Sequence, residues 1–264
     1  MCRLLGIVAN KPVDLEFSLV AGSETLKILS ERNPDGWGIA WYKNGLPHPE
    51  KEPFPAYRSE RYFAVAHSIH TPLAIAHVRY ATTGNLTMAN THPFVWQEWA
   101  FAHNGSVDRA PILDRLAGAH KAALEGETDS EALFHWILQC IEQADDVPTG
   151  IRNAVGVARE LKHSGLNFLL TDGHALYAMR EASRNEDYYS LYSLSRNPAV
   201  AAPMTLKSSE TGLLLQTKSL HGERAVLVCS ERLTKSEEWQ PVPLGHLLTV
   251  SSNLQTSLEK VVCR

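Results

Sequence analysis

A cysteine directly follows the initiator methionine of this 264-residue chain. Removal of Met1 would leave Cys2 with a thiol and a free α-amine on one carbon, a pairing that supplies a nucleophile together with its own base. An α-amine has a pKa of about 7.7–8.0 and a free thiol about 8.5, which favours proton transfer near neutral pH. The ordinary alternative is a small apolar residue near the end of the chain, and Cys2 alone does not decide between the two.

Three further polar signals stand where a predicted element ends or begins: Arg79, Asn104-Gly105 and Asp129. Each has an ordinary interpretation of its own. Arg79 could be a surface arginine beyond a strand, and Asn-Gly is a common hairpin turn. Asp129 could be an acidic residue that the helix dipole favours in a first turn. Only the combination of these residues with Cys2 makes a shared chemistry the stronger interpretation.

Hydrophobic periodicity predicts the elements that must position these residues. Strands are expected over residues 4–8, 37–42, 73–78, 99–102, 166–171, 175–180, 213–217, 225–230 and 246–250. Helices are expected over residues 14–30, 60–69, 128–143 and 148–162. The third helix opens on the pattern Thr-Asp-Ser-Glu at 128–131, which predicts a capping box.

Turn-forming residues separate these elements. Asn44-Gly45 and Asp172-Gly173 predict hairpin turns. Another turn is expected over 33–36, and the four prolines of residues 47–57 predict an irregular crossing. Groups of strands with helices between them predict sheets covered by helices, which is an α+β architecture in layers. We expect one domain over residues 1–264.

Composition and charge exclude several classes of protein. The formal net charge is −4, which predicts no polybasic surface and hence no nucleic-acid partner. No apolar run reaches about 18 residues, so no membrane span is expected. The short apolar run after the early Arg3 is interrupted by Gly6, so no signal peptide is expected. The four cysteines, Cys2, Cys140, Cys229 and Cys263, match no disulfide or metal spacing, and the histidines match no zinc signature. We therefore expect no metal, no cofactor and a reducing cytoplasm.

The order of these motifs resembles the class II glutamine amidotransferases, which are N-terminal-nucleophile hydrolases. The resemblance covers roughly residues 2–135 by motif. Its motifs are Cys2, 33–38 (NPDGWG), 77–82 (HVRYAT), 90–94 (NTHPF), 103–105 (HNG) and 128–131 (TDSE). The strand-rich remainder, including 228–231 (VCSE), resembles the small stand-alone bacterial members. The fold that the resemblance implies is a four-layer αββα sandwich.

The resemblance also implies a role for each catalytic position. Cys2 would attack the γ-amide carbon of glutamine with its own α-amine as base. The side chain of Asn104 and the backbone N–H of Gly105 would form the oxyanion hole. The products would be ammonia and a γ-glutamyl thioester, which water would hydrolyse to glutamate.

The amino-acid end of the substrate would be held by two charged residues. Arg79 would bind the α-carboxylate, which suits its planar guanidinium, and Asp129 would pair with the α-ammonium. Thr82 is expected to line the pocket. One departure stands out: fused amidotransferases commonly have His where this chain has Thr83. We expect the segment from Ala81 to Asn90 to form a differently shaped rim. The loop from Thr82 to His92 is expected to act as a lid.

Three functions remain open at this point. The first is a stand-alone glutaminase whose ammonia passes to a separate synthase subunit. The second is an amidohydrolase of a larger γ-glutamyl compound of thiol metabolism, which Arg79 and Asp129 would recognise equally well. The third is a non-catalytic module that binds glutamine, expected if Met1 is retained. The sequence specifies neither the ammonia acceptor nor the oligomeric state.

Overall fold

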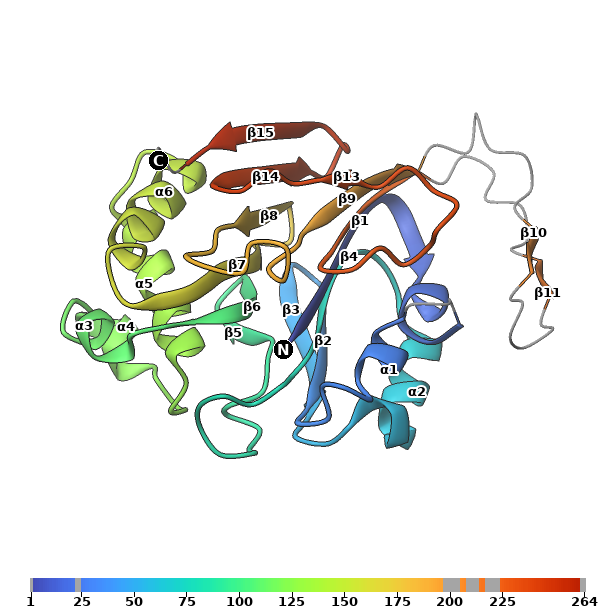
Figure 1. Ribbon diagram of the computed structural model, residues 1–264, viewed down its shortest axis with the longest axis horizontal. Coiled ribbons are helices and arrows are strands. Elements are labelled where there is room, and N and C mark those ends of the chain that lie inside the picture. Colours follow the sequence, from blue (N-terminus) through green and yellow to red (C-terminus); the bar gives the residue numbers. More distant parts are fainter. Residues whose placement is uncertain (1, 22–24, 197–204, 208–213, 217–223, 262–264) are drawn as a thin grey trace.

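Two antiparallel sheets stack face to face, and helices cover the outer face of each (Figure 1). The computed structural model describes residues 2–21, 25–196, 205–207, 214–216 and 224–261. The layers follow one another as helices, sheet, sheet and helices. The four-layer αββα sandwich of α+β class is therefore confirmed.

The first sheet has seven strands and contains the N-terminal strand at its centre. Its order is β13 (Gln240–Pro241), β9 (Tyr192–Arg196), β12 (Ala225–Cys229), β1 (Arg3–Asp14), β4 (His70–Val78), β2 (Trp37–Lys43) and β3 (Leu46–Glu52). Because β1 pairs with β12 on one side and β4 on the other, its start is held by two neighbours.

The second sheet has six strands. Its order is β15 (Thr256–Lys260), β14 (His246–Ser251), β8 (Ala175–Arg180), β7 (His163–Thr171), β6 (Trp99–Val107) and β5 (Phe94–Trp96). A separate pair is formed by β10 (Thr205–Lys207) and β11 (Leu214–Gln216).

The two helical layers differ in length. Over the six-stranded sheet lie α5 (Asp129–Glu142) and α6 (Val147–Ala158), with the short α3 (Arg109–Leu113) and α4 (Gly118–Ala122) beside them (Figure 1). The seven-stranded sheet is covered by short elements: η1 (Phe17–Ala21), α1 (Leu26–Leu29), η2 (Ala56–Arg58) and α2 (Glu60–Ser68).

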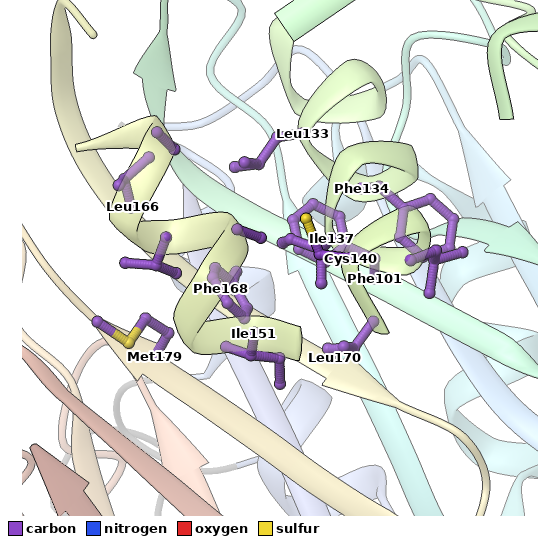
Figure 2. Close-up of a cluster of buried hydrophobic side chains, with 14 of the residues drawn as sticks. Phe101, Leu133, Phe134, Ile137, Cys140, Ile151, Leu166, Phe168, Leu170 and Met179 are labelled. Carbon is purple, nitrogen blue, oxygen red and sulfur yellow. The ribbon is translucent and has the colours of Figure 1, made fainter. Parts of the chain in front are cut away.

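Three buried apolar clusters fill the spaces between the four layers. Figure 2 shows the cluster between the six-stranded sheet and its helices, where Phe101 and Phe168 meet Phe134 and Ile137 of α5. Alternate residues of a strand point to opposite faces. In β1, Leu4 therefore packs between the sheets, whereas Leu5 packs beneath the outer helices.

Most predicted elements are present. The hairpin at Asn44-Gly45 joins β2 to β3 with φ values of 53° and 79°, as a two-residue turn requires. The Asp172-Gly173 turn joins β7 to β8. The predicted strand 213–217 is seen as β11, and its residues 213 and 217 lie outside the described residues.

Three predictions of local structure are wrong. The helix expected over 14–30 is replaced by the end of β1, which pairs Asp14 with His70, and by two short helices. The irregular crossing expected over 47–57 contains β3, which pairs with β2 along its whole length. Its prolines fit because β3 is an edge strand, where a missing N–H costs little. The helix expected over 148–162 ends at Ala158.

Candidate active site

Cys2 lies immediately before β1, and its thiol contacts the chain that leaves the neighbouring strand β4. The backbone N–H of Tyr80 donates to Cys2 Sγ at 3.3 Å, and Sγ lies 3.6 Å from the Tyr80 carbonyl oxygen. The register that pairs Arg3 with Val78 brings these two segments together. Two residues far apart in the sequence thus meet because β1 and β4 are neighbours.

Arg79 follows β4 and is 2% exposed. A turn before β2 holds its backbone: Arg79 N–H donates to Gly36 at 2.7 Å, and its carbonyl accepts from Asp35 N–H at 3.0 Å. The guanidinium donates to the carbonyls of Thr83 at 2.8 Å and Asn85 at 3.2 Å. The charge is therefore held in place and tied to the loop that follows it.

Asn104 and Gly105 lie within β6, so the hairpin-turn interpretation of this pair is wrong. A Cβ on Gly105, where φ is +153°, would lie 1.9 Å from the carbonyl oxygen of Gly165 on β7. Only glycine fits so close an approach of two backbones. The Asn104 amide is buried, and neither its oxygen nor its nitrogen has a hydrogen-bond partner among the described residues.

The strand periodicity indicates where the Asn104 side chain points. Leu4 of β1 and Ala102 of β6 pack in the cluster between the two sheets. Since every second residue of a strand shares a face, Cys2 and Asn104 also face this space, each from its own sheet.

Asp129 is the first residue of α5 and is 5% exposed. Its carboxylate accepts from the Thr83 hydroxyl at 3.0 Å and from Val107 N–H at 2.8 Å. The predicted cap is half formed. Thr128 accepts from Glu131 N–H, but the Glu131 carboxylate accepts from backbone N–H groups of residues 125 and 126 rather than from Thr128.

One pocket brings most of the predicted residues together. Its lining includes Cys2, Arg79, Thr82, Gly105 and Asp129, which come from four separate parts of the chain. Asn104 does not line this pocket and sits buried next to Gly105. Thr83, the departure noted in the sequence, also lines the pocket and donates to Asp129.

Two buried histidines that were not among the predicted site residues also line the pocket, His92 and His103. His103 Nε2 lies 3.1 Å from the Gly165 carbonyl, so this nitrogen carries the proton and Nδ1 accepts from the Ser130 hydroxyl at 2.9 Å. The rings of His92 and His77 contact each other at a tilt of 35°, with centroids 4.2 Å apart. In the sequence, the signal that could have identified His92 and His103 was their position within the motifs 90–94 and 103–105.

Burial keeps these imidazoles neutral. It lowers the pKa of His77 to about 3, with the Arg79 charge adding to the effect. It also lowers the pKa of His92 well below the usual value, helped by His77, and lowers the pKa of His103 despite the nearby Asp129. The pocket therefore contains one fixed cation and one fixed anion on a neutral background.

Burial also raises the pKa of the Cys2 thiol, although the Tyr80 backbone and the Arg79 charge act in the opposite direction. The thiol is thus protonated at neutral pH and needs a base before it can attack.

Among the described residues, no group of three or more His, Cys, Asp or Glu side chains could hold a metal ion. In the same residues no helix has the length and hydropathy needed to cross a bilayer.

Comparisons with known proteins identify the family of this chain. The family model described as glutamine amidotransferases class-II matches residues 1–261. YafJ of Escherichia coli is 30% identical over 262 residues, which cover 93% of this chain and 95% of YafJ. The chain therefore belongs to the class II glutamine amidotransferases.

Solved structures share the fold. A glutamine aminotransferase class-II domain protein from Silicibacter pomeroyi has a TM-score of 0.64 at 22% identity, with 98% of each chain covered. The glutamine phosphoribosylpyrophosphate amidotransferase of B. subtilis has a TM-score of 0.63 at 16% identity, and the match covers 99% of this chain and 50% of that one. The sandwich is thus the fold of this class of protein.

Proposed function

We propose that the protein hydrolyses the γ-amide of glutamine through a thioester on Cys2. The observation that carries the proposal is the pocket in which Cys2, Arg79, Gly105 and Asp129 meet. A nucleophile, a cation, a backbone donor and an anion are the groups that a γ-glutamyl amide needs at its two ends. The single domain over residues 1–264 supplies all of them.

The oxyanion hole uses the two neighbours on β6. The Gly105 N–H and the Asn104 amide would donate to the oxygen that becomes negative when Sγ adds to the γ-carbon. A buried amide without a partner is costly in a folded protein. The developing oxyanion supplies the partner that the Asn104 nitrogen lacks, so this hydrogen bond is gained during the reaction.

The α-amine of Cys2 acts as the base once Met1 is removed. It takes the thiol proton as Sγ attacks and passes a proton to the amide nitrogen, so that the C–N bond breaks and ammonia leaves. A water then adds to the thioester, and its proton returns through the amine to the thiol. Glutamate and the free enzyme result. The raised pKa of Cys2 makes such a base necessary.

Arg79 and Asp129 select the amino-acid end of the substrate. The guanidinium would bind the α-carboxylate and the carboxylate of Asp129 the α-ammonium, with Thr82 at the wall. Both charges are buried and already hydrogen-bonded, so they are in place before substrate arrives. A larger γ-glutamyl compound presents the same two charges.

The loop from Thr82 to His92 serves as the lid. Two carbonyls near its start accept from the Arg79 guanidinium, so a carboxylate that binds Arg79 acts directly on this loop. Limited proteolysis with and without a glutamine-like inhibitor tests the lid, and equal cleavage of the loop in both samples would reject it.

Ammonia passes to a separate synthase subunit in this proposal, and a reducing cytoplasm suits the free thiol.

The decisive test is the intact mass of the protein before and after treatment with 6-diazo-5-oxo-norleucine, a glutamine-like alkylator, followed by peptide mapping. We expect Met1 to be absent and one adduct to lie on Cys2, formed more slowly when glutamine is present. The matched control is Cys140→Ala, because Cys140 is buried and burial raises its pKa to about 11. That variant should label like the wild type.

Two results would contradict the proposal. One is a retained Met1 with an unlabelled Cys2. The other is labelling at Cys140 or Cys229 that glutamine does not slow. Glutamine binding without hydrolysis would then favour the non-catalytic module.

A further inference from the structure

Two tyrosines with exposed side chains stand beside the nucleophile. Tyr80 is 46% exposed, lines the pocket and contacts Cys2 Sγ through its backbone. Tyr188 is 40% exposed and comes from the segment between β8 and β9. Exposed aromatic rings that lie near a catalytic centre are candidates for substrate contact.

Contacts through Arg3 place Tyr188 at the start of β1. The Arg3 guanidinium lies 5.6 Å from the centre of the Tyr188 ring. The same guanidinium donates to the Cys2 carbonyl at 3.1 Å and pairs with Glu231 at 2.7 Å. Tyr188 also packs edge-on against Tyr189, with ring centroids 5.5 Å apart. The ring is therefore held beside the nucleophile while much of it remains open.

Electrostatics give the same location. Burial raises the pKa of Tyr188, and a charge on Cys2 raises it further. The pKa of Tyr189 responds to Cys2 in the same direction. Both rings thus lie within electrostatic range of the thiol.

The proposed mechanism fixes the path of the leaving amine. The glutamyl end points toward Arg79 and Asp129, which are buried. The amide nitrogen must receive its proton from the α-amine of Cys2, so the group on that nitrogen passes the start of β1. Tyr80 and Tyr188 are the exposed aromatic side chains at this position.

We propose that Tyr188, supported by Arg3 and joined by Tyr80, forms a subsite for the leaving group of a γ-glutamyl amide whose amine carries a flat aromatic or apolar group. This inference rests on the proposed function and extends it from glutamine to larger substrates. For such a substrate the same two steps apply. In the first, Sγ forms the thioester while the C–N bond breaks and the α-amine protonates the leaving amine. In the second, water hydrolyses the thioester and releases glutamate.

The test compares kcat/KM for γ-glutamyl-p-nitroanilide with kcat/KM for glutamine, using the full-length protein. We expect the wild type to favour the anilide by about tenfold, since ring stacking and apolar burial both add to binding. Tyr188→Ala should lower this ratio by about fivefold, mostly through KM for the anilide. Tyr188→Phe should keep the ratio, because the ring makes the contact.

Phe54→Ala is the matched control, since Phe54 is a comparably exposed aromatic (47%) in the segment between β3 and η2. It should leave the ratio unchanged. Both kcat/KM values are measured on the same preparation of each variant. A lower fraction of folded protein therefore lowers both values equally and does not change their ratio.

Two results would overturn the subsite while leaving the proposed function intact. The wild type could hydrolyse glutamine and prefer it over the anilide. Alternatively, Tyr188→Ala could leave the ratio at the wild-type value. Failure of the proposed function looks different: neither substrate is hydrolysed and Cys2 is not alkylated, and the subsite is then rejected with it.

Discussion

The two sheets contribute different halves of the site. The seven-stranded sheet carries Cys2 and Arg79 at the ends of the adjacent strands β1 and β4. The six-stranded sheet carries Asn104 and Gly105 within β6, and the helix that covers it supplies Asp129. In the proposed function, neither half alone would bind both ends of a γ-glutamyl group. The site exists only where the sheets meet, so its geometry depends on how the sandwich packs.

The two halves also hold their polar groups differently. Arg79 is fixed by carbonyls of a loop, whereas Asp129 is fixed by a helix start and by the backbone of Val107. Asn104, between the sheets, has no described hydrogen-bond partner. Substitutions in the two halves should therefore separate effects on substrate binding, on the chemical step and on stability.

Gly105→Ala should be the most damaging. The added methyl would lie 1.9 Å from the Gly165 carbonyl oxygen, so β6 and β7 must separate at the oxyanion hole. We expect activity to fall by about a thousandfold or more together with a lower melting temperature, measured by steady-state kinetics and thermal unfolding. Gly156→Ala in α6 is the control, since nothing lies within 4 Å of its added Cβ. Equal effects of the two would contradict the close approach.

Asn104→Ala should lower kcat for glutamine by about a hundredfold to a thousandfold while changing KM little. Because the amide has no described partner in the resting protein, its removal leaves no other group unsatisfied. The melting temperature should then be unchanged or higher. A large loss of stability, or an effect on KM alone, would rule out the oxyanion role.

Asp129→Asn should raise KM for glutamine by about thirtyfold, since a buried charge partner of the α-ammonium is lost. N-acetylglutamine has no ammonium group, so comparing it with glutamine distinguishes the contribution of Asp129 from that of Arg79 on the other sheet. The Asp129 variant should discriminate less than the wild type between glutamine and N-acetylglutamine. Arg79→Lys, on the other sheet, should weaken the binding of both substrates to the same extent. The same discrimination in wild type and Asp129→Asn would exclude the ammonium contact.

The smallest effect concerns pH. Burial lowers the pKa of His77 from 6.5 to about 3, so the folded state holds it neutral while the unfolded chain takes up a proton below pH 6.5. Stability should therefore fall as pH decreases from 6.5 toward 3. His77→Gln should flatten that dependence in thermal unfolding between pH 7 and about 4. His67→Gln, whose side chain is 78% exposed, should not. If both variants show the same dependence of melting temperature on pH, His77 is not the source of that dependence.

Most of the residues that the sequence singled out line one pocket, whereas several of the elements around them were predicted less well. Cys2, Arg79 and Asp129 could be found because each stands at the end or start of a periodic element, in an order that resembles a family. The edge strand β3 was missed because proline is a breaker on average, while an edge strand tolerates it. Of the helix expected over 14–30, only Asp14 pairs with β4, and the apolar spacing is instead shared by the two short helices η1 and α1.

The pocket histidines show a second limit. His92 and His103 have ordinary spacings, and their place in the pocket depends on contacts between elements that are distant in the sequence. His92 meets His77 from β4, and His103 meets Ser130 from α5. The contact of Thr83 with Asp129 joins residues in the same way. Such pairings come from the packing of the sandwich, which local patterns do not encode.

The position of β1 has a consequence for folding. β1, which follows Cys2 directly, pairs Leu5 with Cys229 of β12, a strand that lies far away in the sequence. Pairing of such distant segments is slow, because the long stretch of chain between them must be closed into a loop first. The Cys2 thiol therefore acquires its final surroundings late in folding.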